Sequence, residues 1–316
     1  MSARVKGFFG TLRGHEIKNH RDDREKTCDS LFQMLQSVYD LGESTVYITH
    51  EQAKSLRIRV EDMALVDNDD GYTLRPSEEF FRPLSIEALN ACPLDENDKG
   101  AKRLSELVRG WSGMVSFLEE NYSTLYGELG SKLLQLANAR RRVGTGENAT
   151  STTLLRMNKW RKNLGIIPDI INPYYQDMLK DNISATQRFF IEASCYSAYR
   201  REDEPHVSII LSCFYQGKED ISHAEVSTIL AAMVTQLEHD KLESHSITPV
   251  LLISFMNFQG RILQAYATND GLVIQKSKLC SFRTQEEFEK SMSLFLRWIA
   301  SERVGDTYKQ VRLDPF

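Results

Sequence analysis

The residues best suited to chemistry are a histidine and a glutamate two positions apart, His223 and Glu225. Zinc-dependent nucleobase deaminases use this H-x-E arrangement at the start of a helix, where the histidine binds zinc and the glutamate transfers protons. That chemistry needs two further zinc ligands from a P-C-x-x-C helix after the next strand, and residues 256–260 read MNFQG instead. Because a single histidine cannot hold a catalytic zinc ion, the pattern does not predict a metal site.

Glu225 also has a structural interpretation, which we favour. Ser222 stands three residues before it, and Ser-x-x-Glu is typical of a capping box, in which both side chains satisfy free amides of the first helical turn. The enzymatic alternative is a site assembled from dispersed residues, because strand ends and helix starts converge in sheets of this kind. Its catalytic candidates are His223, Glu225, His206 and Glu192.

A nuclease-like fold is a second enzymatic alternative for the C-terminal part of the chain. Restriction-type nucleases hold magnesium with carboxylates on neighbouring strands. The strands expected at 249–256, 261–268 and 272–276 carry no acid, and Ile274 stands where a ligand acid would be needed. The sequence therefore argues against an active nuclease and leaves an inactive relative of such a fold as an alternative.

No cofactor is predicted. Residues 144–149, GTGENA, match the G-x-G-x-x-A pattern of dinucleotide-binding turns, which must follow a buried strand and open a helix. Here the pattern follows an arginine-rich helix end and precedes a polar linker, so we interpret it as a flexible loop. The chain contains no G-x-x-x-x-G-K-[ST] phosphate-binding loop.

A basic segment between residues 140 and 162 stands out in the charge pattern. Its cations are the anion-binding candidates of this chain: Arg140, Arg141, Arg142, Arg156, Lys159, Arg161 and Lys162. With Glu147 as its single acid, the segment carries +6, whereas the whole chain carries −5. Such a cluster could hold phosphates of a nucleic acid, a cofactor or a phosphoprotein. The alternative is a basic helix end that faces the protein's own acids, for example Asp95, Glu96 and Asp98.

These residues must be positioned by an α+β fold, with a mostly helical N-terminal half and a strand-rich C-terminal half. Apolar spacing and capping residues predict helices near residues 22–41, 49–56, 101–119, 121–142, 154–164, 222–242 and 285–301. Short apolar runs and turn residues predict a strand at 45–48, a hairpin at 63–74, strands at 189–193 and 207–211, and a β-meander at 249–276.

The domain organisation expected from these elements has three parts. Residues 1–143 form a mostly helical region with a small hairpin, residues 144–185 a flexible linker with a basic helical segment, and residues 186–316 an α+β domain. The small, polar residues of the segment that begins at Gly144 mark the best internal break.

Composition indicates an intracellular globular protein. The 316 residues are 41% hydrophobic and 26% charged, and the net charge of −5 argues against a dedicated nucleic-acid binder. Five widely spaced cysteines without a C-x-x-C pair are typical of reduced thiols, which favours a cytoplasmic or nuclear location. The acid-poor start of the chain permits a mitochondrial presequence, an alternative that we favour less. No apolar run is long enough to span a membrane.

Residues 186–308 resemble a protein family of filamentous ascomycete fungi. The resemblance lies in the runs HAEVSTILAAMVTQLEHDK, TPVLLISFMNFQGRILQAYATNDGLVIQKSKLCSF and FLRWIASERVGDTY. No activity, cofactor or catalytic residue is known for that family, so the resemblance implies a fungal origin and a shared domain and transfers no site.

The sequence therefore leads to a non-enzymatic intracellular binding protein with an unknown protein partner. The motivation is that each catalytic motif lacks essential members, while the basic segment stands out. The alternatives are an enzyme with a dispersed site in residues 186–316, and nucleic-acid or phosphate binding through residues 140–162.

Overall fold

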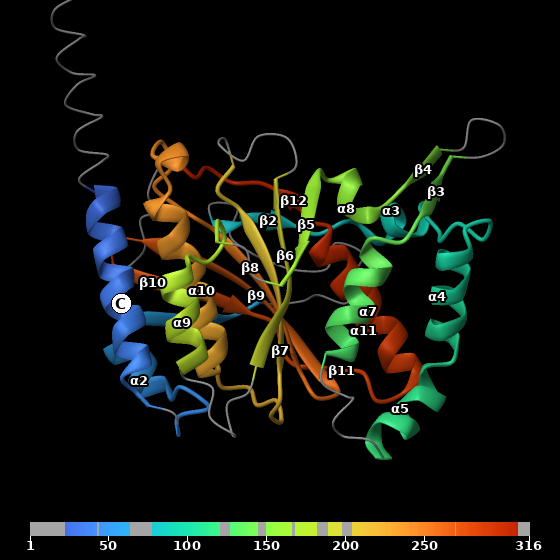
Figure 1. The fold of residues 1–316 in the computed structure, drawn as a ribbon, viewed down its shortest axis with the longest axis horizontal. Helices are drawn as coiled ribbons and strands as arrows, with labels where there is room; N and C mark the ends of the chain where they lie inside the picture. The colour runs from blue at the N-terminus through green and yellow to red at the C-terminus, as the bar shows by residue number, and fades with distance from the viewer. Residues whose placement is uncertain are drawn as a thin grey trace, which may run out of the picture.

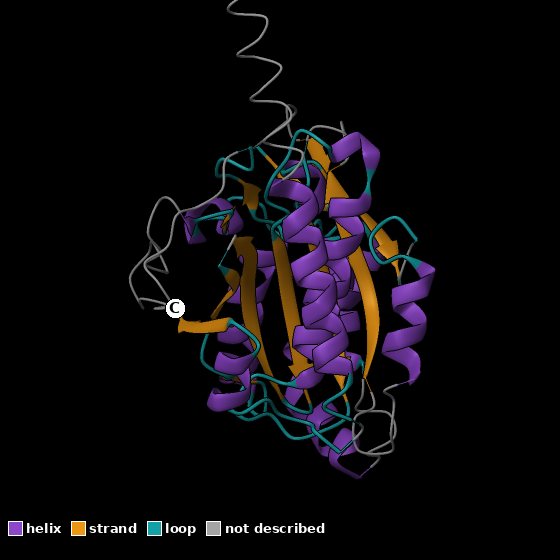
Figure 2. Ribbon diagram, turned by 90° about the vertical axis from the view of Figure 1, so that its left-hand side faces the viewer, coloured by secondary structure: helices purple, strands orange, loops and turns teal. Residues whose placement is uncertain are grey.

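The computed structural model describes residues 23–42, 44–63, 78–120, 127–144, 150–165, 168–181, 189–197, 204–268 and 270–308. Within these ranges, an eight-stranded mixed sheet stands between two layers of helices (Figure 1). Figure 2 shows long helices that run roughly alongside the strands. The α+β class predicted from the sequence is confirmed.

The sheet order is β1-β10-β9-β8-β7-β6-β5, and β11 pairs with β9. Its strands are β1 (Ile58–Asp62), β5 (Trp160–Leu164), β6 (Phe189–Ser197), β7 (Val207–Cys213), β8 (Val250–Met256), β9 (Gln259–Thr268), β10 (Gly271–Lys276) and β11 (Cys280–Ser281). β7 and β8 are parallel, as are β1 and β10, and the other neighbours are antiparallel. Every residue of β7 and β8 is buried because helices cover both faces, which explains their near-continuous apolar sequences.

The connections of the sheet follow the sequence pattern in its C-terminal part. β8, β9 and β10 form the predicted β-meander through two antiparallel pairings. Parallel neighbours need a crossover, and α10 (His223–Glu238) supplies it between β7 and β8. Every residue of α10 from His223 to Leu237 is buried, so this helix is part of the core.

One face of the sheet is covered by α10, by α9 (Pro173–Asp181) and by a helix at residues 23–39 (Figure 1). The helix at residues 23–39 buries apolar side chains at a spacing of three and four, namely Leu31, Met34, Leu35 and Val38. α2 (His50–Ser55) completes this layer. None of the helices in the described part of the chain is long and apolar enough to cross a membrane.

The opposite face is covered by α7 (Glu128–Ala137) and α11 (Gln285–Ile299), with α4 (Lys99–Arg109) and α5 (Trp111–Glu120) farther along this layer (Figure 1). Trp111 of α5 anchors the layer, because its ring stacks on Phe288 with centroids 4.1 Å apart and its Nε1 donates to the Phe282 carbonyl at 2.7 Å. The shorter elements are α3 (Ile86–Asn90), α8 (Leu154–Met157), η4 (Asp240–Leu242), the β2–β12 pair (Phe81–Arg82 with Glu302–Arg303) and the β3–β4 pair (Arg141–Val143 with Thr150–Thr152).

The predicted capping residues begin helices in the structure. Several of the predicted helices, however, have the wrong length. Capping boxes are present at Thr49, Ser222 and Thr284. The helix predicted at 101–119 is divided at Gly110 into α4 and α5. The helix predicted at 121–142 is replaced at its end by β3, because α7 stops at Ala137.

The helix predicted at 154–164 is correct in its first turn and wrong in its second half. α8 occupies residues 154–157, but residues 160–164 form the edge strand β5, which pairs with β6. Trp160 is buried in the core beneath α11, and its Nε1 donates to the Ser301 carbonyl at 2.7 Å. This tertiary packing and the pairing with β6 outweigh local helix propensity. The strand predicted at 45–48 is reduced to one bridge between Tyr47 and Ser222.

The sheet draws strands from each of the three regions expected from the sequence: β1 from residues 1–143, β5 from 144–185, and the remaining strands from 186–316. The hairpin predicted at 63–74 lies outside the described residues except for Met63. The glycine-containing loop at 144–149 likewise lies outside them except for Gly144.

Candidate functional site

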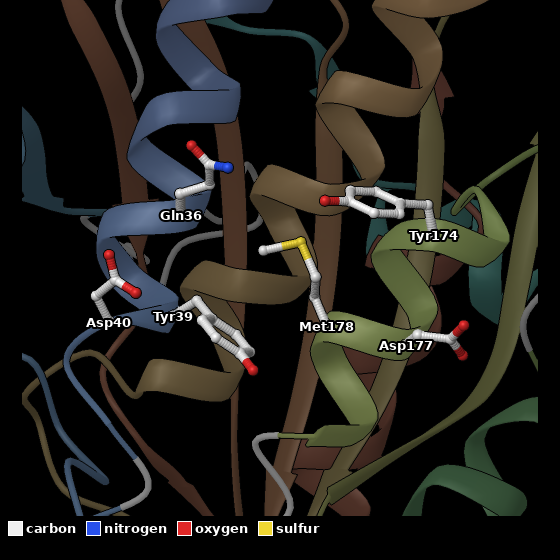
Figure 3. Close-up of a pocket in the computed structure, with 6 residues that line it drawn as sticks. All are labelled: Gln36, Tyr39, Asp40, Tyr174, Asp177 and Met178. Carbon is white, nitrogen blue, oxygen red and sulfur yellow. The ribbon is translucent and has the colours of Figure 1, made fainter.

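A groove opens between the helix at residues 23–39 and α9 (Figure 3). It encloses about 580 Å³ and is lined by Gln36, Tyr39, Asp40, Tyr174, Asp177 and Met178. We call it the outer groove. Its volume falls within the range of roughly 300–1,000 Å³ that is typical of ligand sites.

The helical repeat explains why these six residues line one site. Gln36, Tyr39 and Asp40 stand at positions i, i+3 and i+4, and so share one side of the first wall. Tyr174, Asp177 and Met178 repeat the same spacing in α9. Because both helices also bury an apolar side against α10, the polar sides remain available to form the groove.

The side chains are arranged around a central methionine. In Figure 3, Met178 lies between Tyr39 and Tyr174, while Asp177 turns away from the helix at residues 23–39. Tyr174 is 59% exposed, so its ring is open to solvent. The site therefore offers two phenol groups, a thioether, an amide and a carboxylate on Asp40.

Several contacts fix the two walls to α10. Tyr175 of α9 donates from Oη to the Glu238 carboxylate at 2.5 Å, and its ring meets Phe32 with centroids 6.1 Å apart. Just before α9, the Asn172 amide donates to Thr235 Oγ1 at 2.9 Å. The distance between the walls is therefore set by hydrogen bonds and packing rather than by the groove residues themselves.

Two ionisable side chains, Cys28 and Tyr175, belong to the helices that form the walls of the outer groove. Burial, followed by the charges of Glu238 and Asp29, raises the pKa of the Cys28 thiol to about 11. Burial, followed by the hydrogen bond to Glu238, also raises the pKa of Tyr175. Burial is the largest cause of both shifts, and Glu238 adds to each of them.

Glu225 has the structural role that its spacing indicates. The Ser222 amide donates to Glu225 Oε2 at 2.8 Å, and the Glu225 amide donates to Ser222 Oγ at 3.2 Å. Burial alone would raise its pKa, but the charge and hydrogen bonds of Arg261, with those of Ser222, hold the pKa of Glu225 below its usual range. The side chains of Glu225 and Arg261 are both fully buried, and they form an ion pair.

His223 is also engaged within the fold. Its Nε2 lies 2.9 Å from the Val38 carbonyl, and its Nδ1 lies 3.3 Å from Ser227 Oγ. Burial lowers the pKa of the imidazole, which favours the neutral ring. The histidine therefore connects the first turn of α10 to the end of the helix at residues 23–39.

His206 lies at the other end of the sheet. It precedes β7, whereas Glu225 follows it, and the seven residues of that strand span on the order of 20 Å. Its Nε2 is 3.0 Å from the Val304 carbonyl, and burial lowers the pKa of its ring to about 4. The convergence of His206 with His223 and Glu225 that we expected is not observed.

Glu192 lies on the opposite face of the sheet, against α7. Ser212 Oγ donates to its Oε1 at 2.7 Å. Gly127 and Gly130 make room for it, since a Cβ atom at either position would lie within 3.0 Å of the carboxylate. Burial, and to a smaller extent the charge of Glu128, raises the pKa of Glu192 to about 7. The sheet thus separates Glu192 from Glu225.

The basic segment does not form one continuous surface. Arg141 is buried and donates from Nη1 to the Cys92 carbonyl at 2.7 Å. Arg140 pairs with Asp98 at 3.7 Å, as the self-pairing alternative predicts. Arg161 and Lys162 are neighbours on β5, and therefore face opposite sides of the sheet.

The remaining members of the set are Arg142 on β3, Arg156 on α8 and Lys159 in the turn before β5. Within the described part of the chain, Arg142, Arg156, Arg161 and Lys162 make no ion pair. Anion binding by these four cations stays a prediction, and at most three of them share one face.

The sequence reasoning missed the outer groove. Its six residues carry no chemical motif, and its walls are far apart in the chain. The only available signal was the amphipathic spacing of each helix, which predicts a polar side but not what that side faces.

No protein-family profile, curated protein or solved structure matches this chain. The resemblance to an ascomycete family therefore stays a prediction.

Proposed function

We propose that this protein is a non-catalytic binding protein that holds a segment of a partner protein in the outer groove. The supporting observation is the groove itself, whose six lining side chains come from two helices fixed on α10. Tyrosine and methionine are enriched at the centres of protein interfaces, where they supply contact area and adaptable packing.

The state of the catalytic candidates also supports binding over catalysis. Glu225, His223 and His206 each make hydrogen bonds within the fold at buried positions. Their roles are in capping, connecting and packing. From the cysteine usage and the resemblance, we further propose that the partner is met in the cytoplasm or nucleus of an ascomycete cell.

A site-specific crosslinker tests the proposal. We would place p-benzoylphenylalanine at Gln36, an exposed residue of the groove, and at Gln135, an exposed residue of α7 on the opposite layer. The expected result is one protein crosslinked from Gln36 and not from Gln135. That protein would then be purified and titrated against the full chain.

Groove-filling variants decide whether the captured protein is a true partner. Met178→Trp should weaken its binding at least tenfold, because the indole occupies the central space of the groove. Gln135→Trp adds the same ring on the opposite layer and should leave binding unchanged. A partner that binds equally to both variants, or that crosslinks from Gln135 as well, would overturn the proposal.

A further inference from the structure

We infer that the outer edge of β5 receives an extended acidic segment of a partner protein, which adds to the sheet as a further strand. This surface is separate from the outer groove, so the inference goes beyond the proposed function. The sheet order ends at β5, and within the described part of the chain only β6 pairs with it. An edge of this kind displays amides and carbonyls that an added chain can use.

The hydrogen-bond pattern shows which backbone groups of β5 point outward. The Gly165 amide donates to the Glu192 carbonyl at 2.8 Å, so these two residues form a hydrogen-bonded pair at the end of the β5–β6 ladder. Along an antiparallel ladder, such pairs alternate with pairs that make no hydrogen bond to each other. By this alternation, the amides and carbonyls of Lys162 and Leu164 point away from β6.

The charged side chains of β5 are all positive. Arg161 is exposed and Lys162 is half-buried, and neither makes an ion pair within the described part of the chain. Glu192 is the acid of β6, and the charge that acts on it is that of Glu128 rather than that of either cation. The two cations of β5 are therefore available to a ligand.

The other edge of the sheet differs in this respect. In β1, Arg59 lies 3.7 Å from Glu61, and Asp62 lies 2.9 Å from Lys276 of β10. The charges of that edge have partners of opposite sign within the chain. Of the two edges, β5 is therefore the one whose charge calls for an acidic ligand.

Arg161 and Lys162 face opposite sides of the sheet, and this alternation suits an added strand. Such a strand also alternates its side chains, so two consecutive acids would lie opposite Arg161 and Lys162, one on each face. Leu164 shares the face of Lys162 and is 72% exposed, so it would lie opposite an apolar side chain. An antiparallel ligand would therefore carry an apolar residue, any residue and two acids, in that order.

Other occupants fit this edge less well. If two copies of β5 paired antiparallel about the centre of the strand, Lys162 of each copy would face the same residue of the other, which is destabilising. The phosphates of a nucleic acid could accept from the outward amides but would be repelled by the outward carbonyls. An acidic peptide satisfies the amides, the carbonyls and the cations together. The alternative to any occupant is that Lys162 only keeps other strands away.

Amide exchange of the full chain, measured by NMR, tests whether the edge is open. The outward amides of Lys162 and Leu164 should exchange faster in the free protein than the Asn163 amide, which points toward β6. An excess of the peptide Thr-Val-Thr-Glu-Glu-Val-Thr should slow both outward amides by about tenfold or more. If both are already protected in the free protein, the edge is covered and the inference fails.

The requirement for charge is tested with the same peptide carrying a fluorescent label, by fluorescence anisotropy. Replacing both glutamates by glutamine should weaken binding about tenfold. Lys162→Glu should weaken it by a similar factor, and a peptide with lysine in place of its first glutamate should restore binding to that variant. Lys102→Glu makes the same charge change at an exposed site on α4 and should leave binding unchanged.

The requirement for backbone pairing is tested separately. Leu164→Pro removes an outward amide without touching the bonds to β6, and should weaken binding about tenfold, whereas Leu164→Ala should weaken it about threefold at most. Methylating the backbone nitrogens of the first valine and first glutamate of the peptide should also abolish binding. Methylating the residue that follows each of them should not, because those amides point away from β5. Circular dichroism verifies that each variant is folded.

Four outcomes would overturn the inference. Equal binding of the glutamine peptide would remove the requirement for acids. An equal loss in Lys162→Glu and Lys102→Glu would show a response to net charge alone. Equal binding of the two methylated peptides would show that no strand is added. Failure of the acidic peptide to bind at all would leave Lys162 as a residue that only protects the edge. None of these results bears on the outer groove, which the crosslinking experiment tests.

Discussion

Arg261 of β9 and Glu225 of α10 form a wholly buried ion pair in which the guanidinium group is fully hydrogen bonded. Its Nε donates to Glu225 Oε1 at 2.8 Å and its Nη2 to Glu225 Oε2 and, at 2.8 Å, to the Asp220 carbonyl. Its Nη1 donates to the carbonyls of Lys218 and Glu219, each at 3.0 Å. The pair therefore joins the start of α10, the preceding loop and the sheet.

Removing either partner should strongly destabilise the fold. We expect Glu225→Gln and Arg261→Met each to lower the free energy of unfolding by about 3–5 kcal/mol, because each leaves a buried charged or polar group uncompensated. Urea denaturation measures the change. The double variant should lose clearly less unfolding free energy than the sum of the two single variants. Strictly additive losses would contradict an energetic coupling between Glu225 and Arg261. Glu302→Gln, which removes an exposed partner of Arg82, should cost less than about 1 kcal/mol.

Arg24 should hold the first wall of the groove in place. Its guanidinium donates to carbonyls at and after the end of α10, including Leu237 at 2.6 Å and Gln236 at 3.2 Å. Arg24→Met keeps the stem but leaves buried carbonyls unsatisfied, so we expect a loss of about 2–3 kcal/mol in unfolding free energy. Hydrogen exchange should accelerate in residues 23–39. Lys26→Met is the control, and unchanged exchange in Arg24→Met would contradict this role.

Glu192 should make stability depend on pH. Its pKa is raised from 4.5 to about 7, so the folded protein binds the proton more tightly than the unfolded chain. The stabilisation linked to this proton is fully present below pH 4.5 and is lost as pH rises through 7. Among the described residues, Ser212, Glu128, Gly130 and the N-cap residue Gly127 face this carboxyl.

The Glu192→Gln variant removes this titration. Between pH 5 and pH 8, the free energy of unfolding should fall by on the order of 1 kcal/mol more in the wild-type protein than in the variant. This figure allows for solvent screening of a half-exposed carboxyl. Urea denaturation at several pH values checks the difference. Glu106→Gln serves as an exposed control. Parallel pH profiles for wild type and Glu192→Gln would show that this carboxyl does not titrate as described.

The divided basic segment limits any binding of nucleic acid. At most three of Arg142, Arg156, Arg161 and Lys162 share one face, so the slope of log K against log salt should not exceed about 3 in magnitude for a DNA duplex. Filter binding between 50 and 200 mM salt measures it. A slope near 6 would show that the segment acts as one surface, contrary to the alternation of β5.

The C-terminal part of the fold could be predicted because its signals are local. Ser222 and Thr284 mark helix starts by their spacing to Glu225 and Glu287, and both capping boxes are present. The β-meander follows from short apolar runs between turn residues. Such patterns depend on hydrogen bonds and side chains within a few residues of each other, which a sequence displays directly.

The errors occurred where distant contacts override local preference. The sequence predicts a helix at residues 160–164. These residues instead form β5, because Trp160 packs into the core and the backbone pairs with β6. The sequence predicts that Arg141 belongs to an anion-binding surface. In the structure it is buried and donates to the Cys92 carbonyl. Neither partner can be inferred from the residues that flank these positions.

By itself, the sequence determined the α+β class, the capped helices and the buried strands of this protein, because helix caps and apolar periodicity act over a few residues. The tertiary structure alone decided that Glu225 is committed to Arg261, that Glu192 and Glu225 lie on opposite faces of the sheet, and that Tyr39 and Tyr174 share one groove. The reason is physical: these relationships depend on which helix face packs on α10 and which strands pair, and those choices are settled by burial across the whole core.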